Sequence, residues 1–254
     1  MNIAIITGAS SGLGGQFARL VDGQYDEIWA IARRAERLEQ LRAQLKTPVR
    51  VLAMDLTDKA APRELKRQLS ECGADARLLI NAAGYGKIGN WDDISLSDCE
   101  NMIDLNCRAA VAVTRVALEH MGRGARIMQI CSTSAFQPFQ YLNVYAASKA
   151  FLYRYSRALR VELRPRGISV TAVCPYWIKD TEFIPVAQDT RDSAYIRSFP
   201  FASRQEQVAR RALADALKGR AVSTPGVVCT LHRIAAKLVP AGLMMRLWEL
   251  LRRI

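Results

Sequence analysis

Short apolar segments alternate with amphipathic segments along most of the chain. The apolar segments are rich in β-branched residues and are bounded by Gly, Pro or polar residues, as buried strands are. They cover residues 3–7, 27–32, 49–56, 76–84, 125–132 and 168–175. The segments between them have helical spacing, as in 35–45 with leucines at 38, 41 and 45. Helices are predicted near 13–21, 35–45, 63–69, 96–121, 144–164 and 205–220.

This alternation predicts an α/β fold. Strands that alternate with helices build right-handed βαβ units around a parallel sheet. The strand segments are apolar almost throughout, which is typical of a sheet covered by helices on both faces. No repeat, linker or low-complexity tract interrupts the pattern. We therefore predict a single doubly wound, Rossmann-type domain over residues 1–254.

Composition agrees with an ordinary globular protein. Of the 254 residues, 50% are hydrophobic and 24% are charged. The N-terminus lacks a basic region followed by a long apolar one, and no run approaches the ~18 apolar residues of a membrane span. The six cysteines are scattered without CxxC pairs, so we expect reduced thiols, no metal site and a cytoplasmic protein.

The net charge of +12 is concentrated toward the C-terminus. From Arg204 onward there are ten Lys/Arg and three Asp/Glu, so seven of the net positive charges lie in the last 51 residues. No zinc-finger spacing or RNA-binding aromatic signature accompanies them, and we expect a solvated basic face and no nucleic-acid partner.

The last segment, about 241–254, predicts an amphipathic helix. Its apolar side carries leucines 243, 247, 250 and 251 with Ile254, and its polar side carries Arg246, Glu249 and Arg253. The helix is too short to span a bilayer. Its apolar side has three possible partners: the domain itself, a second subunit, or an anionic membrane surface.

A glycine-rich turn follows the first strand. Residues 7–14, TGASSGLG, carry glycines in the spacing G-x-x-x-G-x-G between a strand and a helix. Glycines here let the backbone approach a phosphate, and the N–H groups that begin the helix favour an anion. The turn therefore predicts a dinucleotide site, although a plain glycine turn remains an alternative.

Two arginines follow the second strand, where dinucleotide folds often place an acid that binds ribose hydroxyls. The strand ends AIARR, so Ala32 stands at that position and Arg33 and Arg34 follow it. Guanidinium groups match phosphate oxygens, which favours NADP(H), with its 2′-phosphate, over NAD(H). The alternative is two solvated arginines.

From residue 2 to about 175 the chain resembles the classical short-chain dehydrogenases/reductases. The resemblance lies in six motifs in order, each at a strand end or on the helix that follows, and Ser132 and Tyr145 are 13 residues apart as is usual in that family. The motifs are TGASSGLG (7–14), DLTD (55–58), NAAG (81–84), DLNCRAA (104–110), ICSTSAF (130–136) and YAASK (145–149).

The resemblance implies a catalytic tetrad. Tyr145 would be the acid/base, and Lys149, one helical turn away, would lower its pKa and bind the nicotinamide ribose. Ser132 would hold the substrate oxygen, and Asn106 would support a water that relays protons from Lys149. Taken singly, these residues also fit a packed Tyr–Lys pair, a strand-end serine and a helical asparagine bonded to backbone.

The resemblance also implies the remaining contacts. Tyr176 stands where the family usually has glycine after Pro175, and Asp180 stands near its usual threonine, with Thr181 next. Tyr176 and Trp177 are candidate walls of a substrate pocket, or they pack under the loop. Residues 176–204 would form a substrate lid. The implied cofactor contacts are Gly8, Ser10, Ser11, Gly12, Leu13, Gly14, Arg33, Arg34, Asp55, Leu56, Asn81, Ala82, Gly84, Tyr145, Lys149, Pro175 and Ile178; Asn81 also fits a structural cap.

These patterns together predict an NADP(H)-dependent oxidoreductase. Its reaction would be reversible hydride transfer between nicotinamide and a carbonyl or secondary alcohol, and the apolar lid residues favour an apolar substrate. The resemblance implies a homodimer or homotetramer. Two alternatives from other classes are an NADP(H)-binding regulatory protein and a membrane-surface scaffold that acts through the basic C-terminal helix.

Overall fold

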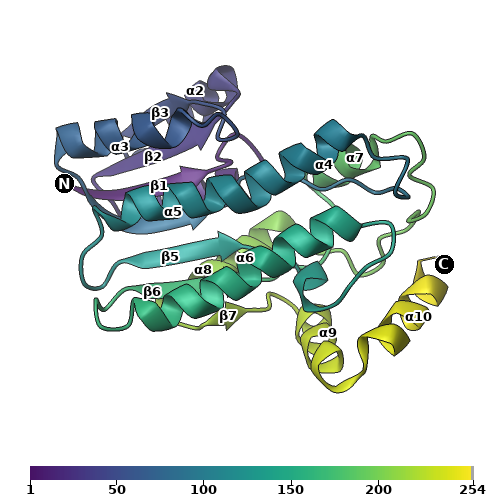
Figure 1. Ribbon diagram of the computed structural model, residues 1–254. Coiled ribbons are helices and arrows are strands. Elements are labelled where there is room, and N and C mark those ends of the chain that lie inside the picture. The colour runs from purple at the N-terminus through teal and green to yellow at the C-terminus, as the bar shows by residue number, and fades with distance from the viewer. Residues whose placement is uncertain (253–254) are drawn as a thin grey trace.

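In the computed structural model, which describes residues 1–252, seven parallel strands form one sheet (Figure 1). The strand order is β3-β2-β1-β4-β5-β6-β7. The strands are β1 (Asn2–Thr7), β2 (Glu27–Ala32), β3 (Val49–Ala53), β4 (Asp75–Asn81), β5 (Arg126–Ile130), β6 (Ser169–Val173) and β7 (Val222–Ser223). The predicted doubly wound α/β fold is confirmed.

Helices cover both faces of the sheet. The first face packs α3 (Ala61–Cys72), α5 (Ala110–Leu118) and α6 (Asn143–Glu162). The opposite face packs α1 (Gly12–Leu20), α2 (Ala35–Gln44) and α8 (Gln205–Leu217). Successive side chains of β1 enter these two cores in turn, since Ile3 and Ile5 belong to the first and Ala4 and Ile6 to the second. The continuous apolar strand pattern follows from this double burial.

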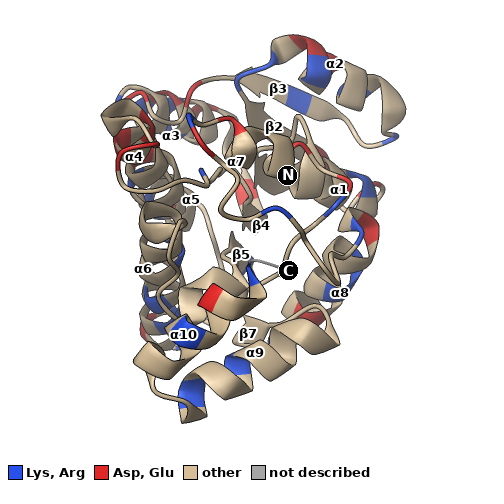
Figure 2. Ribbon diagram, turned by 90° about the vertical axis from the view of Figure 1, so that its right-hand side faces the viewer, with Lys and Arg blue, Asp and Glu red and all other residues tan. Residues whose placement is uncertain are grey.

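The chain changes direction across the sheet at β1. It adds β2 and then β3 on one side of β1, and then places β4 on the other side. The carboxyl ends of β1 and β4 therefore border a crevice, because the loops that leave them run in opposite directions. Figure 2 looks onto this edge of the sheet.

The long helix predicted at 96–121 is interrupted by a wider turn. It consists of α4 (Leu96–Ile103), the π-helical turn η1 (Asp104–Ala109) and α5. Such π-turns within an α-helix are often found at functional sites. The buried Asn106 lies within this turn.

The C-terminal third contains elements that the sequence analysis did not predict. The lid segment includes a short helix, α7 (Phe183–Gln188), and β7 and α9 (Val227–Leu238) follow α8. The predicted last helix is α10 (Ala241–Leu251), and the part of that prediction at 253–254 lies outside the described residues. Between residues 1 and 252, no helix is long and apolar enough to cross a membrane.

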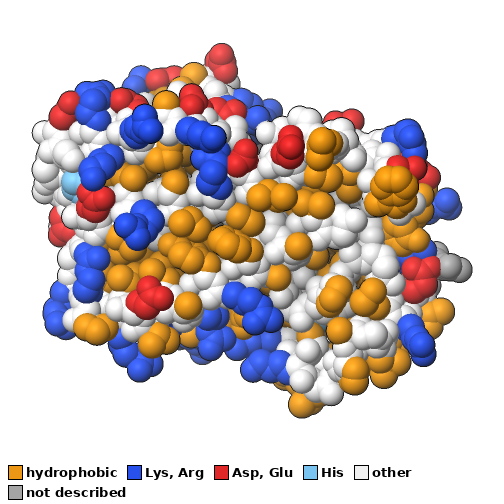
Figure 3. All heavy atoms as spheres, viewed as in Figure 1, with side chains coloured by type: hydrophobic (Ala, Val, Ile, Leu, Met, Phe, Trp, Pro, Cys, Tyr) orange, Lys and Arg blue, Asp and Glu red, His pale blue; other side chains and the backbone are white. Residues whose placement is uncertain are grey.

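Helices α9 and α10 expose apolar side chains. In the view of Figure 3, hydrophobic side chains lie over both helices, beside Lys and Arg. The exposed members are Val227, Leu231, Ile234 and Leu238 on α9 and Leu243, Leu247, Leu250 and Leu251 on α10. The leucine side of α10 therefore does not pack on the domain, and Trp248 is its buried residue.

Candidate active site

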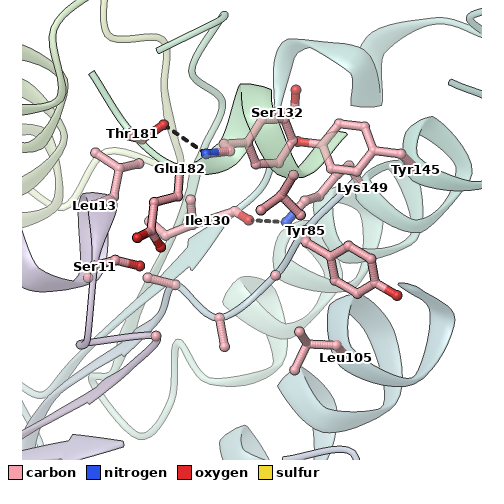
Figure 4. Close-up of a pocket in the computed structure, with 18 of the residues that line it drawn as sticks. Ser11, Leu13, Tyr85, Leu105, Ile130, Ser132, Tyr145, Lys149, Thr181 and Glu182 are labelled. Carbon is pink, nitrogen blue, oxygen red and sulfur yellow. Dashed lines mark hydrogen bonds between the residues drawn. The ribbon is translucent and has the colours of Figure 1, made fainter. Parts of the chain in front are cut away.

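A cavity of about 660 Å³ lies at the carboxyl ends of the strands. Figure 4 shows Ser11, Leu13 and Glu182 on one side of it and Ser132, Tyr145 and Lys149 on the other. Every predicted cofactor residue except Asn81 lines this cavity, and both predicted substrate residues do as well. The cavity thus joins the glycine-rich turn to the Tyr–Lys pair.

The glycine-rich turn is too tight for other residues at two positions. Gly8 has a φ of +68°, and a Cβ there would lie 2.8 Å from the backbone N of Ala83. A Cβ on Gly14 would lie 2.2 Å from the backbone O of Gly8. Ser11 precedes α1 and its side chain does not cap the helix. The first N–H groups of α1 therefore have no side-chain cap competing with a bound anion.

Arg34 is already engaged in an ion pair. Its guanidinium donates to the hydroxyl of Ser11 at 2.9 Å and pairs with the carboxylate of Glu182 at 2.9 Å. Arg37 binds the same carboxylate. Hydrogen bonds from both arginines hold the pKa of Glu182 below its usual value, so the carboxylate is ionised. Glu182 thus ties the start of the lid to the predicted phosphate site, while Arg33 lines the cavity beside it.

Asp55 lies at the end of β3 and lines the cavity. Its carboxylate accepts hydrogen bonds from the backbone N and the hydroxyl of Thr57, at 2.9 and 2.7 Å. Burial raises the pKa of Asp55, but the Thr57 bonds and the nearby Arg33 outweigh burial and lower it overall. Asp55 therefore adds a negative charge to the cavity lining close to Arg33.

Two predicted residues lie behind the cavity wall. Asn81 donates to the side chains of Thr114 and Gln129, at 2.9 and 3.0 Å, so its side chain ties β4 to α5 and β5. This placement matches the structural alternative for Asn81. Asn106 bonds the backbone N and O of Tyr85 and donates to the hydroxyl of Ser148 at 3.0 Å. Its side chain is fully buried and forms no direct bond to Lys149.

Ser132, Tyr145 and Lys149 meet at the other end of the cavity. Ser132 follows β5, and its hydroxyl accepts from the backbone N of Ser134 at 3.1 Å. Tyr145 and Lys149 lie one turn apart on α6, with the Lys149 Nζ 5.7 Å from the centre of the Tyr145 ring. Lys149 donates to the backbone O of Ile130 at 2.9 Å, which fixes its side chain in the cavity wall (Figure 4).

The structure does not show the lowered tyrosine pKa that the Tyr–Lys pair predicted. Burial raises the pKa of Tyr145, and the hydrogen bond with the Ser132 side chain only partly offsets this. Burial also lowers the pKa of Lys149. Both shifts have the same cause, since an apolar surrounding disfavours the charged form of each group. The expectation from the Tyr–Lys pair alone was wrong because it ignored burial.

The substrate end of the cavity is aromatic. Trp177 packs edge-on against Phe199 with ring centroids 4.7 Å apart, and Phe183 lies 5.4 Å from Tyr145 by the same measure. Tyr176 also lines the cavity, and burial raises the pKa of its phenol. Trp177 therefore fits both predictions made for it, because it lines the cavity and its ring packs against Phe199 of the lid segment.

Of the two residues near the position of the family's usual threonine, Thr181 lines the cavity and Asp180 does not. Asp180 accepts from the backbone N of Gln205 at 2.8 Å, at the start of α8, and so has a structural role. Thr181 lines the cavity, 3.7 Å from the Cβ position of Gly12. Its neighbour along the chain, Glu182, also lines the cavity and was not predicted as a site residue, although it lies within the predicted lid.

Other lining residues left no local signal in the sequence. Phe139 and Trp248 line the substrate end, and their rings meet edge-on at 5.0 Å. Trp248 lies more than a hundred residues along the chain from Phe139 and Tyr145, so only the folded chain reveals its position.

Comparison with known proteins agrees with this geometry. The family model described as short chain dehydrogenase matches residues 2–192. Sulfoacetaldehyde reductase 2 of Chromohalobacter salexigens is 34% identical over 188 residues, 72% of this chain and 74% of that protein. The NADP-dependent 3-hydroxy acid dehydrogenase YdfG of Salmonella typhi is 33% identical over 187 residues, 72% of this chain and 75% of that protein.

Solved structures with the same architecture include two bound to nucleotide. A short-chain dehydrogenase from Sphingobium yanoikuyae in complex with NADPH has a TM-score of 0.78 at 27% identity, covering 96% of this chain and 95% of that one. One from Burkholderia cenocepacia in complex with NADP has a TM-score of 0.73 at 27% identity, covering 87% and 94%. The chain therefore belongs to the short-chain dehydrogenase/reductase family and is an oxidoreductase.

Proposed function

We propose that this protein is an NADP(H)-dependent oxidoreductase that interconverts an apolar carbonyl compound and the corresponding secondary alcohol. The observation that carries the proposal is the single cavity that joins the glycine-rich turn to Ser132, Tyr145 and Lys149. A dinucleotide stretched along this cavity would have its phosphates at the turn and its nicotinamide beside Tyr145. Hydride chemistry is what such a cofactor supplies when it is bound.

The residues at the turn fit a dinucleotide. The close approach of Gly8 and Gly14 to neighbouring backbone leaves the N-terminus of α1 open to a pyrophosphate. Arg33 and Arg34 are the side chains that would meet a 2′-phosphate, with the hydroxyls of Ser10 and Ser11 beside Arg34. The printed names of relatives and neighbours that use NADP or NADPH support the same choice of cofactor.

Tyr145 would act as the acid and base of the reaction. Its raised pKa keeps the phenol protonated at neutral pH, which suits proton donation to the oxygen of a carbonyl being reduced. Ser132, which shares a hydrogen bond with Tyr145, would hold the same substrate oxygen. Lys149 would orient the cofactor and adjust the charge around the phenol.

Asn106 and Lys149 would share a proton relay without touching each other. A Cβ added at Gly84 would lie 2.7 Å from the Oδ1 of Asn106 and 3.1 Å from the Nζ of Lys149. The two polar groups therefore border the same glycine. A water that bonds both would connect Lys149 to the backbone of Tyr85, which Asn106 holds.

An uncharged, apolar substrate suits the aromatic end of the cavity. Trp177, Phe183 and Trp248 contribute rings to it. The cation at this end, Lys87, is buried and pairs with Asp189 at 3.3 Å, so its charge already has a partner. The named substrates of the relatives, sulfoacetaldehyde and a 3-hydroxy acid, carry a charge that this end of the cavity would meet poorly.

We also propose that the protein self-associates as a homodimer or homotetramer through helices α5 and α6. Hydrophobic side chains gather between these helices on the face shown in Figure 3. Phe151 and Val161 on α6 are 48% and 61% exposed. Substituting Phe151→Arg should shift the sedimentation coefficient toward that of a monomer, and an unchanged assembly would contradict this interface.

The function is tested by a comparison of Tyr145→Phe with Tyr153→Phe, a control on the same helix. Fluorescence titration should show that NADPH binds wild type and both variants within about twofold, because a single phenol oxygen contributes little to binding. Reduction of an apolar ketone, followed by NADPH absorbance, should fall about 100- to 10,000-fold in Tyr145→Phe alone. Full activity in Tyr145→Phe would refute its role as the acid, and absent NADPH binding in the wild type would refute the cofactor assignment.

A further inference from the structure

Helices α9 and α10 follow each other across a bend at Val239 and Pro240, and specific contacts hold both helices against the domain. We refer to these two helices together as the hairpin. His232 hydrogen bonds Gln137 at 3.0 Å, and Trp248 donates its indole N–H to the backbone O of Gln140 at 3.3 Å. Gln140 in turn donates to the backbone O of Met245 at 3.1 Å. These contacts lie in the loop between Ser132 and α6, so the hairpin rests directly beside the active site.

Each of the two helices also has an apolar side that is uncovered. Val227, Leu231, Ile234 and Leu238 recur at helical spacing along α9, and each is at least 49% exposed. Leu243, Leu247, Leu250 and Leu251 do the same on α10, at 45% or more. We call these eight side chains the outer apolar stripe. A surface helix normally turns such a stripe inward, so this one requires a partner.

The charges around the stripe are almost all positive. Lys237 and Arg246 are exposed beside it, and α9 contains no Asp or Glu. The acid of α10, Glu249, is bound by Arg252 through two hydrogen bonds. Figure 2 shows the Lys and Arg positions on both helices.

This charge pattern argues against a second copy of the chain as the partner. A two-fold contact through the stripe would place Lys237 and Arg246 of both copies beside one interface, where Glu249 is the one acid that the two helices carry. Like charges that meet without carboxylates between them oppose association. A surface that is apolar inside and anionic outside would satisfy both the leucines and the cations.

We propose that the hairpin of α9 and α10 docks the protein on the surface of an anionic lipid membrane. The outer apolar stripe enters the region between headgroups and acyl chains, and Lys237 and Arg246 meet the anionic headgroups. Helices of 12 and 11 residues are about 18 Å and 17 Å long, so they lie on a bilayer rather than cross it. The docked hairpin holds the cavity wall formed by Trp248 close to the lipid.

The test measures binding to vesicles of phosphatidylcholine with and without phosphatidylglycerol, by co-sedimentation. It needs neither cofactor nor substrate, so its result is independent of the proposed enzyme activity. The wild type is expected to sediment with the anionic vesicles and to be released in part by salt. Leu238→Gln with Leu250→Gln should lower the partition coefficient about 100-fold, or about tenfold per leucine that no longer enters the lipid.

Matched variants separate the stripe from other exposed apolar residues. Leu96 and Leu217, which lie on α4 and α8, are 74% and 46% exposed, and the same pair of Gln substitutions there should leave binding unchanged. Lys237→Gln with Arg246→Gln should weaken binding to anionic vesicles about fivefold per residue and leave binding to neutral vesicles unchanged.

Three results would overturn the proposal. The wild type could remain in the supernatant with anionic vesicles. The control pair could reduce binding as much as the stripe pair does, which would assign the contact to general hydrophobicity. Finally, the stripe pair could convert an oligomer into monomers in analytical ultracentrifugation without changing vesicle binding, which would identify a second copy as the partner.

Discussion

The ion pairs of Glu182 predict a specific change in cofactor preference when that carboxylate is neutralised. Glu182 binds Arg34 at 2.9 Å and also binds Arg37, so it occupies one of the two arginines that would meet a 2′-phosphate. The 2′-phosphate must therefore displace the Glu182 carboxylate from Arg34 or share Arg34 with it, whereas NADH has no 2′-phosphate. Glu182→Gln removes the competing charge and keeps the shape of the side chain.

The size of the effect follows from the exposure of the pairs. The side chains of Arg34, Arg37 and Glu182 are 41%, 42% and 46% exposed, so each pair is a surface pair. Surface pairs contribute about 0.2–1 kcal/mol each, so two of them correspond to about 0.4–2 kcal/mol. Glu182→Gln should therefore lower the Kd for NADPH about 2- to 30-fold and change the Kd for NADH much less.

Fluorescence titration of both cofactors measures this directly, at two ionic strengths because salt screens exposed pairs. Glu39→Gln is a matched control, since Glu39 is also 46% exposed and pairs with Arg42 on the same surface helix, outside the cavity. Weaker NADPH binding in Glu182→Gln would refute the reasoning, because it would show that Glu182 helps to close the lid over the phosphate. An equal gain in NADPH affinity in Glu39→Gln would show that the effect comes only from the change in net charge.

Three further predictions concern the turn, the tyrosine and the substrate wall. Gly14→Ala places a Cβ 2.2 Å from the backbone O of Gly8, so it should weaken NADPH binding at least about tenfold and lower the free energy of unfolding by about 1–3 kcal/mol. The control Gly242→Ala, whose Cβ would have nothing within 4 Å, should change neither quantity. Fluorescence titration and denaturant unfolding measure the two effects, and normal NADPH binding by Gly14→Ala would contradict the tight turn. Burial raises the pKa of the Tyr145 phenol, so the phenolate absorbance missing from Tyr145→Phe should appear in the cofactor-free wild type only above about pH 10, and its appearance near neutral pH would contradict the buried geometry. Trp248→Ala should raise the KM for apolar ketones and leave the Kd for NADPH unchanged, and an unchanged KM would remove α10 from the substrate site.

Much of the fold could be predicted from periodicity. Strands buried on both faces are apolar throughout, and helices packed on one side carry apolar residues every three or four positions. The order of the strands through β6 and of the helices through α8, apart from the short helix α7, was therefore predictable. The helix α9 could also have been found, because Val227, Leu231, Ile234 and Leu238 have helical spacing. Its orientation could not, because spacing shows which residues share a side of a helix but not what that side faces.

The candidate site was predictable where its residues follow strand ends in known motifs. Parallel strands bring their carboxyl ends to one edge, so the glycine-rich turn, Arg33, Asp55 and Ser132 were expected to lie together, and all of them line the cavity. Asn81 was placed with them by the same logic, but its side chain points into the core because adjacent residues at a strand end point to opposite sides. Thr181 and Glu182 lie in a loop, where no periodicity applies.

The sequence by itself determined the family resemblance, the α/β fold class and the residues expected to bind phosphate and move protons, because these depend on local spacing along strands and helices. Only the tertiary structure decided the environment of those residues. Burial reversed the expected shift in the pKa of Tyr145, Glu182 reached Arg34 from far along the chain, and Trp248 closed the substrate end while the leucines of α10 turned outward. Burial, pairing and orientation depend on which distant segments meet, and local spacing carries no information about those meetings.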